Sequence, residues 1–207
     1  MKIGIIGSGN VGGALGRRWA KNGHQVIFGG RDPEATDLKQ LAAESGGTAA
    51  SLADAARDGD VLLLATPWEP TEQIVKSLGN VSGKVLIDAT NPLAGLSGLT
   101  LGTTTSAAEQ VASWAPGAKV VKAFNTVGAN IMADPSFAAG KVVLFYCGDD
   151  AEAKATVKPF IDELGFEAVD AGPLTQARLL EPFALLWISL AYAQKLGRDF
   201  AFQLLRR

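Results

Sequence analysis

The feature that most constrains the fold of this chain is a glycine pattern near its start. Gly7-Ser8-Gly9-Asn10-Val11-Gly12 follows a β-branched run at 2–7 and opens a segment, 10–22, with apolar residues at helical spacing. A G-x-G-x-x-G turn between a strand and a helix is typical of dinucleotide-binding domains. There, Gly7 allows the tight turn, Gly9 lets the backbone approach a pyrophosphate, and Gly12 lets helix and strand pack closely. We therefore expect a phosphate cradle at the start of this helix.

Strand and helix patterns alternate along most of the remaining chain, and the strands are continuous apolar runs. Such runs are typical of a parallel sheet covered by helices on both faces. The pattern predicts an α/β, Rossmann-type, doubly wound and mostly parallel sheet with a short carboxyl-terminal α/β and helical extension. We expect a dinucleotide-binding domain over 1–140 and a smaller portion, 141–207, that packs on it and contributes to a second ligand pocket.

The predicted elements follow from these runs. Strands are expected at 2–7, 25–29, 61–65, 84–88, 119–124, 142–147 and 167–170. Helices are expected at 10–22, 34–45, 69–78, 106–114 and 151–164, with a last helix or helix pair over 174–205. The Gly-, Ser- and Thr-rich segment 93–105 reads as an irregular loop, and loops of this length are often functional.

The end of the second expected strand bears on the choice of dinucleotide. Sites for NAD usually place an acidic residue here, where it bonds the ribose 2′-hydroxyl. This chain has uncharged Gly30 and then Arg31, whose guanidinium can pair with the 2′-phosphate of NADP. We therefore favour NADP over NAD. Asp32 either bonds a ribose hydroxyl or caps a helix that begins near Pro33, and we favour the cap.

Turn-forming and polar residues follow two further strands. Thr66-Pro67-Trp68 ends the strand at 61–65, and Asp88 lies shortly before Asn91-Pro92. In open α/β sheets, ligands bind outside the carboxyl ends of the strands. Thr66, Pro67 and Trp68 would then border the nicotinamide half of the cofactor, with packing under a loop as the alternative for Trp68. Asp88 is expected to bond the backbone near its turn.

Asn125 and Thr126 follow the strand at 119–124 and are the candidates for contact with reacting groups. Their side chains can bond a carboxamide or a substrate carbonyl, and the alternative role is to cap a turn. A dehydrogenase for a small hydroxy or imino acid would need a Lys or His acid near the nicotinamide. Lys122 is the one nearby lysine, and it lies within the strand.

Composition excludes several other kinds of chemistry. With 47% apolar and 19% charged residues and a net charge of −2, the 207 residues suit a globular protein and give no sign of nucleic-acid binding. His24 and Cys147, the single histidine and cysteine, cannot form a His/Cys zinc site, and we read both as structural. Asp149-Asp150 is better explained as helix capping than as a metal site. The longest apolar run is too short for a membrane span, so we expect a cytoplasmic protein.

Several segments together carry a resemblance to a known family. They are the glycine turn, Gly30-Arg31, Thr66-Pro67-Trp68-Glu69, Lys122-Ala123-Phe124-Asn125-Thr126, Cys147-Gly148-Asp149-Asp150 and Asp170-Ala171-Gly172-Pro173-Leu174. As a set, they resemble the NADP-dependent oxidoreductases that use coenzyme F420, a deazaflavin, over nearly the whole chain. The segment 122–126 also resembles the cytosolic NADPH-binding domain of six-transmembrane ferric reductases.

The resemblance implies hydride transfer between NADP(H) and coenzyme F420 or a flavin (FMN or FAD). By resemblance, Ser8, Gly9, Asn10 and Val11 contact the pyrophosphate region, Arg31 contacts the 2′-phosphate, and the segment around Asn125 and Thr126 faces the acceptor. The protein would hold two flat rings face to face and needs no strong acid of its own.

Alternatives to this reading remain open. They are a ferric or flavin reductase-like protein, a small-acid dehydrogenase and a non-catalytic NADPH sensor. The apolar segment 183–192 is richer than one small domain requires, which suggests a homodimer interface through the carboxyl-terminal helix.

Overall fold

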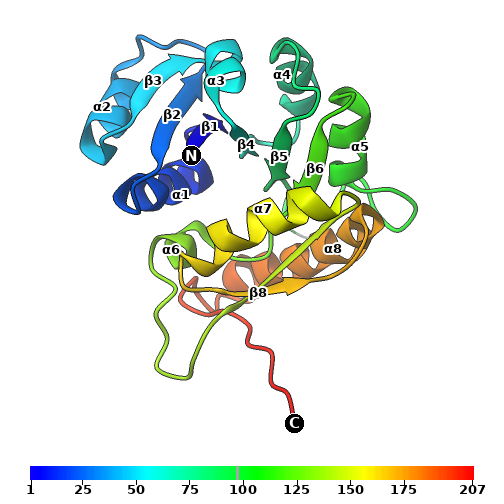
Figure 1. Cartoon of the computed structure of the whole chain (residues 1–207). Coiled ribbons are helices and arrows are strands. Elements are labelled where there is room, and N and C mark those ends of the chain that lie inside the picture. Colours follow the sequence, from blue (N-terminus) through cyan, green and yellow to red (C-terminus); the bar gives the residue numbers. More distant parts are fainter. Residues whose placement is uncertain (97) are drawn as a thin grey trace.

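The computed structural model describes residues 1–96 and 98–207, and its centre is one eight-stranded sheet (Figure 1). The strand order is β3-β2-β1-β4-β5-β6-β7-β8. All neighbouring pairs are parallel except β6 and β7, which are antiparallel. The strands are β1 (Lys2–Ile6), β2 (Gln25–Gly30), β3 (Thr48–Ser51), β4 (Val61–Leu64), β5 (Val85–Asp88), β6 (Lys119–Lys122), β7 (Val143–Gly148) and β8 (Glu167–Asp170). The predicted Rossmann-type, mostly parallel sheet is confirmed.

Helices connect the strands and cover the sheet. They are α1 (Asn10–Lys21), α2 (Thr36–Ser45), α3 (Leu52–Asp58), α4 (Thr71–Ser77), α5 (Ala107–Trp114), α6 (Ala129–Ala133), α7 (Ala151–Asp162) and α8 (Ala177–Ile188). Two short helical turns, η1 (Leu174–Gln176) and η2 (Ser189–Ala193), flank α8. In Figure 1, α7, α8 and β8 lie together in the carboxyl-terminal half, and the chain end extends beyond them.

Several sequence expectations for these elements were wrong. Strand β3 and helices α3 and α6 were not expected; β3 is a four-residue edge strand with no fully buried side chain, and α6 has only five residues. Helix α2 begins at Thr36 rather than near Pro33, and its N-cap is Ala35, so Asp32 does not cap it. The last helical segment ends at Ala193 rather than continuing to 205, because the following residues form an irregular segment that returns to β7, where the Val143 amide donates to the Phe202 carbonyl at 3.0 Å.

Both faces of the sheet are buried, which explains the uninterrupted apolar strands. On one face, Ile3 and Ile5 of β1 pack with Leu15 and Trp19 of α1. On the other, Ile6 packs with residues from β4, β5 and α5. Burial on both sides removes the need for alternating polar residues.

The strand order reverses between β1 and β4, which form the centre of the sheet. The chain runs outward from β1 through β2 to β3, and then returns to the other side of β1 as β4. A reversal of this kind leaves a crevice at the carboxyl ends of the two strands, because their following helices cover opposite faces. The crevice lies between the glycine turn after β1 and the Ala65-Thr66 turn after β4, and it positions the candidate site.

Candidate functional site

Two glycines of the turn, Gly7 and Gly12, are required by the backbone geometry, whereas Gly9 faces open space. Gly7 has a φ of +103°, a left-handed conformation that strains other residues. A Cβ on Gly12 would overlap the carbonyl oxygen of Gly7. Gly9 has an ordinary φ of −68°, and a Cβ there would meet no atom within 4 Å. Gly9 therefore leaves open the space in front of the helix.

The start of α1 is suited to an anion. Its N-cap is Gly9, which makes no side-chain cap bond, and its first turn has no acidic residue. The first amides of a helix lack intrahelical acceptors and carry partial positive charge. The open cradle at Gly9 and these bare amides fit the pyrophosphate of a dinucleotide.

A first hollow at the crevice extends from the glycine turn toward β2. It has a volume of about 380 Å³ and is lined by Gly7, Ser8, Gly9, Gly29, Gly30, Arg31, Leu52, Ala65, Thr66, Pro67, Pro70, Gln73 and Ile74. Arg31 is exposed and makes no ion pair within the described part of the chain. The Asp32 carboxylate accepts the Glu34 amide at 2.9 Å and so forms a local turn. The guanidinium beside it remains available to a ligand anion.

The second hollow extends from the same turn toward β5. It has a volume of about 360 Å³ and is lined by Val11, Ala65, Thr66, Pro67, Trp68, Glu69, Ala89, Thr90, Asn91 and Leu93. The two hollows share Ala65, Thr66 and Pro67. A ligand with two ends joined by a pyrophosphate would therefore fit across the glycine turn, with one end in each hollow.

Hydrogen bonds hold the turn between the two hollows. The Thr71 hydroxyl donates to the Pro67 carbonyl at 2.7 Å and also bonds the Thr66 hydroxyl at 2.8 Å. Trp68 stacks on Trp114 of α5 with ring centroids 5.4 Å apart. Trp68 thus packs against a helix, which was the alternative role, and it also lines the second hollow.

Asn125 and Thr126 are almost fully buried, and Asn125 bonds Asn91. The Asn125 side-chain amide donates to Asn91 Oδ1 at 3.1 Å and to the Leu180 carbonyl at 3.2 Å, while the Asn91 amide donates to the Asn125 carbonyl at 3.0 Å. Among the described residues, the Asn125 Oδ1 and Thr126 Oγ1 atoms have no hydrogen-bond partner. Asn91, rather than the two predicted residues, forms the surface of the second hollow.

A buried triad of charged side chains, Asp88, Lys122 and Glu181, lies next to Asn125 and Asn91. The sequence did not predict this cluster. The Lys122 ammonium lies 2.9 Å from Asp88 Oδ2 and 2.8 Å from Glu181 Oε1, and it donates to the Thr90 carbonyl at 2.6 Å. Side-chain exposure is 0% for Lys122 and Asp88 and 1% for Glu181. Burial opposes the charge of Lys122, but the two carboxylates outweigh it and raise the pKa of Lys122.

The two carboxylates of the triad also accept hydrogen bonds from residues on either side of the 93–105 loop. Asp88 Oδ1 accepts the amide and hydroxyl of Thr90, at 2.9 and 2.7 Å. Glu181 accepts the Ala107 and Ala108 amides, at 2.9 and 3.2 Å, at the start of α5. The expected backbone role of Asp88 is therefore found.

The triad also decides whether Lys122 is available as an acid. An ammonium has three donors, and those of Lys122 have three acceptors in Asp88, Glu181 and Thr90. No proton is left for a substrate, which argues against the small-acid dehydrogenase. The sequence did carry a signal for this cluster, because its charged residues lie within otherwise apolar elements. A charged residue in such a place is rarely buried unless it is paired.

The other single residues considered from the sequence have structural roles. His24 lies 3.0 Å from Glu163, away from the crevice. Cys147 is buried, and burial raises the pKa of its thiol to about 12. Asp150 caps α7 by accepting the Ala153 amide at 2.7 Å, and Asp149 accepts the Leu174 amide at 2.8 Å. The capping interpretation is confirmed for Asp150, whereas Asp149 bonds the start of η1 instead of capping α7.

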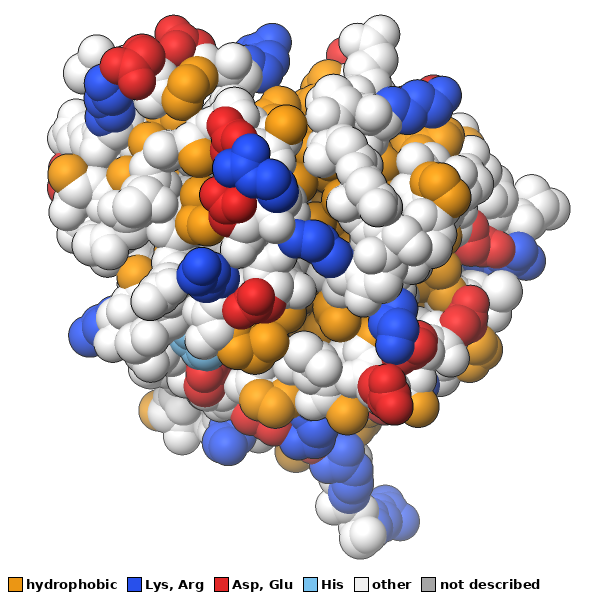
Figure 2. All heavy atoms as spheres, turned by 45° about the horizontal axis from the view of Figure 1, so that its top comes forward, with side chains coloured by type: hydrophobic (Ala, Val, Ile, Leu, Met, Phe, Trp, Pro, Cys, Tyr) orange, Lys and Arg blue, Asp and Glu red, His pale blue; other side chains and the backbone are white. Residues whose placement is uncertain are grey.

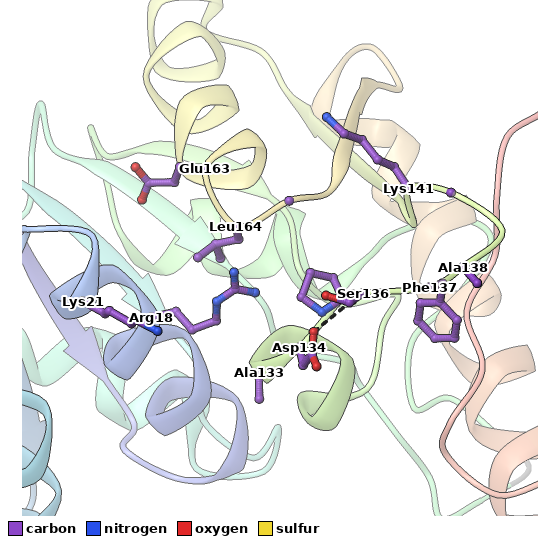
Figure 3. Close-up of a pocket in the computed structure, with 13 residues that line it drawn as sticks. Arg18, Lys21, Ala133, Asp134, Ser136, Phe137, Ala138, Lys141, Glu163 and Leu164 are labelled. Atoms are coloured by element: carbon purple, nitrogen blue, oxygen red, sulfur yellow. Dashed lines mark hydrogen bonds between the residues drawn. The ribbon is translucent and has the colours of Figure 1, made fainter.

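A larger hollow, of about 940 Å³, lies between the end of α1, α6 and the end of α7 (Figure 3). Three of the five charged side chains that line it are engaged locally. Arg18 donates to the Met132 carbonyl at 3.3 Å, Asp134 accepts the Ser136 amide at 3.0 Å, and Glu163 pairs with His24. This hollow does not include the uncapped start of α1 and lies away from the carboxyl ends of the strands. We therefore place the candidate site at the glycine turn, although the two hollows there are smaller.

The surface view shows basic and acidic side chains interspersed on the face drawn (Figure 2). No helix in the described part of the chain is both long and apolar enough to span a bilayer. Together, the crevice at the strand reversal, the bare glycine turn and the uncapped helix define a Rossmann-type dinucleotide-binding protein.

Comparison with known proteins narrows this class. The family described as NADP oxidoreductase, coenzyme F420-dependent, matches residues 2–92. The F420-dependent NADP reductase of Methanocaldococcus jannaschii is 33% identical over 207 residues, which cover 92% of this chain and 92% of that protein. This chain belongs to the coenzyme F420-dependent NADP oxidoreductase family, as the resemblance predicted.

Other relatives extend the comparison. Metalloreductase STEAP3 of Rattus norvegicus is 32% identical over 89% of this chain, which spans only 36% of that protein. A solved structure from Arthrobacter sp. FB24, to which F420-dependent NADP reductase activity is ascribed, has a TM-score of 0.91 and 34% identity over the whole of both chains. A reductive aminase from Aspergillus terreus, with 22% identity, a TM-score of 0.69 and coverage of 95% of this chain and 62% of its own, shares the fold.

Proposed function

We propose that this protein is an NADP(H)-dependent oxidoreductase whose acceptor is coenzyme F420. The observation that carries the proposal is the open glycine turn between two hollows, in a chain that matches an F420-dependent NADP reductase over 92% of both lengths. NADPH, when bound, supplies a hydride from its nicotinamide to the acceptor. The chain's own residues bind and orient the two rings and exclude water.

Residues at the crevice divide this work between the two ends of the nucleotide. Ser8, Gly9, Asn10, Val11 and the start of α1 bind the pyrophosphate, and Gly7 and Gly12 keep the turn in shape. Gly30 and Arg31 bind the adenosine end, where the guanidinium pairs with the 2′-phosphate. Thr66, Pro67 and Trp68 border the nicotinamide end.

On the acceptor side, we propose that residues 141–207 complete the pocket. Asn125 bonds the Leu180 carbonyl of α8, and Glu181 of the same helix holds the start of α5. Asn125 acts from beneath by fixing Asn91, and contact with the acceptor falls to Asn91 and to the loop that follows it.

The acceptor is tested by titrating purified protein with NADPH and then following its oxidation at 340 nm with coenzyme F420, FMN, FAD or a ferric chelate, each added separately. We expect binding of NADPH and fast oxidation with coenzyme F420 alone. Preference for a flavin or a ferric chelate would support the ferric or flavin reductase-like alternative, for which the similarity to metalloreductase STEAP3 is the supporting observation. Tight NADPH binding without turnover on any acceptor would identify an NADPH sensor.

We also propose a cytoplasmic homodimer that binds no nucleic acid. Leu179 and Leu186 on α8 are 65% and 49% exposed, and Tyr192 and Leu196, further along the chain, are 47% and 63% exposed. A second copy packed on this part of the chain would cover these apolar side chains. Light scattering at micromolar concentration should give twice the chain mass, and a monomer would refute the dimer.

A further inference from the structure

The Asp88–Lys122–Glu181 triad is not electrically balanced. It contains two carboxylates and one ammonium, all with side-chain exposure of 1% or less. The backbone amides at the start of α5 compensate only part of the excess, because a helix start carries about half a positive charge. The neighbouring Glu109 and Arg178 form a 2.8 Å hydrogen bond and cancel one another. A net negative charge therefore remains in the interior.

This charge lies directly behind the second hollow. Asp88 bonds both the amide and the hydroxyl of Thr90, Lys122 bonds the Thr90 carbonyl, and Thr90 and its neighbour Asn91 line the hollow. Water is excluded from the triad, so its field is screened less than that of a surface group. The hollow is the end of the crevice assigned above to the nicotinamide.

Loss of a hydride changes the charge of a nicotinamide from zero to +1 and leaves the rest of the nucleotide unchanged. We propose that the buried triad favours the oxidised, cationic nicotinamide over the reduced, neutral one, and so assists hydride donation by the nucleotide. The triad acts through its field and touches neither ring. This inference rests on the proposed function, because it requires the nucleotide to occupy the crevice.

The test is the ratio of the dissociation constants of NADP⁺ and NADPH, measured by calorimetry under anaerobic conditions without acceptor. Glu181→Gln removes one buried negative charge while preserving side-chain size. We expect the ratio Kd(NADP⁺)/Kd(NADPH) to rise about three- to tenfold. Asp88→Asn removes the other carboxylate charge and should shift the ratio in the same direction.

Leu180→Ala is the matched control. Leu180 is 6% exposed, next to Glu181 on the same helix, and carries no charge. Its truncation should lower the melting temperature and leave the ratio within about twofold of that of the intact protein, since a packing defect does not distinguish a cation from a neutral ring.

The outcomes separate this inference from the proposed function. If the intact protein binds neither nucleotide, the proposed function fails. If it binds both and the two charge variants leave the ratio unchanged, or change it no more than Leu180→Ala does, the triad has no electrostatic role. If neither charge variant folds, the two dissociation constants of the intact protein are the test. Tighter binding of NADPH than of NADP⁺ would then overturn the inference.

Discussion

Two parts of the crevice, the glycine turn and the wall behind the second hollow, are built in opposite ways. At the glycine turn, the binding surface is bare backbone: Gly9 faces open space, and the start of α1 has no capping side chain. Behind the second hollow, Asp88, Lys122 and Glu181 form a closed network of side chains from three elements. The glycine turn is open to a ligand anion, whereas the triad holds a loop and a helix in place from the interior.

This difference separates binding from stability. A change at Gly9 should alter ligand affinity while the fold is retained, because a Cβ there meets no atom within 4 Å. A change in the triad should alter the fold first, because each charge there depends on its partners for compensation.

The largest effect is expected from Lys122→Met. The substitution leaves two carboxylates buried without their cation, and loss of one partner of a buried ion pair typically costs about 3–5 kcal/mol. Denaturant unfolding should show a loss of this size. Lys119→Met is the control at the other end of β6, where the lysine pairs with Asp150 at 3.0 Å and both side chains are about one-third exposed. Its loss should be much smaller, and equal losses would refute the stabilising role of the triad.

Gly9→Val should abolish binding with little effect on folding. The valine would fill the space left for the pyrophosphate, so NADPH affinity should fall by about 100-fold or more, roughly 2.7 kcal/mol. The melting temperature should change little, because a Cβ at Gly9 meets no atom within 4 Å. Gly12→Ala provides the contrast: its Cβ overlaps the Gly7 carbonyl, so this variant should melt earlier. Unchanged affinity in folded Gly9→Val would show that the phosphate site lies elsewhere.

The same contrast explains which parts could be predicted from the sequence. The glycine turn is a local pattern, because its residues are neighbours in the chain and each has a role set by backbone geometry. The continuous apolar strands likewise predicted a sheet buried on both faces. By contrast, β3 carries only small side chains and no apolar run, so its pairing with β2 gave no local signal.

The triad could not be assembled from the sequence, because its members come from β5, β6 and α8. The sequence showed Lys122 within a strand and Asp88 before a turn, but the cation and its partners meet only after β5 and β6 pair and α8 packs beside them. For the same reason, Asn125 was expected at the surface of the site and lies beneath Asn91. Whether an asparagine lines the site or supports it from beneath depends on tertiary packing rather than on residue type.

Arg31→Ala should change nucleotide preference by a smaller amount. If the guanidinium pairs with the 2′-phosphate, the variant should lose about 10- to 30-fold in NADPH affinity, the size of a charge-assisted hydrogen bond, and little in NADH affinity. Asp32→Ala is the control, because its carboxylate is engaged by the Glu34 amide at 2.9 Å. It should leave the preference unchanged. Equal losses of NADPH and NADH affinity in Arg31→Ala would refute the 2′-phosphate assignment.

The smallest effect concerns Glu109, whose charge lies near the triad but partly in solvent. Hydrogen bonds from Arg178 and Ser106 outweigh burial and hold the pKa of Glu109 below its ordinary value of 4.5. The carboxylate therefore stabilises the fold above about pH 4.5, and this stabilisation is lost as the pH falls through the lower, folded-state pKa. Glu109→Gln should be slightly less stable than the intact protein at pH 7, by far less than Lys122→Met, and the gap should close in acid. Denaturant unfolding between pH 7 and pH 3 measures this gap, and a gap that stays constant over the range would show that the ion pair with Arg178 contributes nothing to stability.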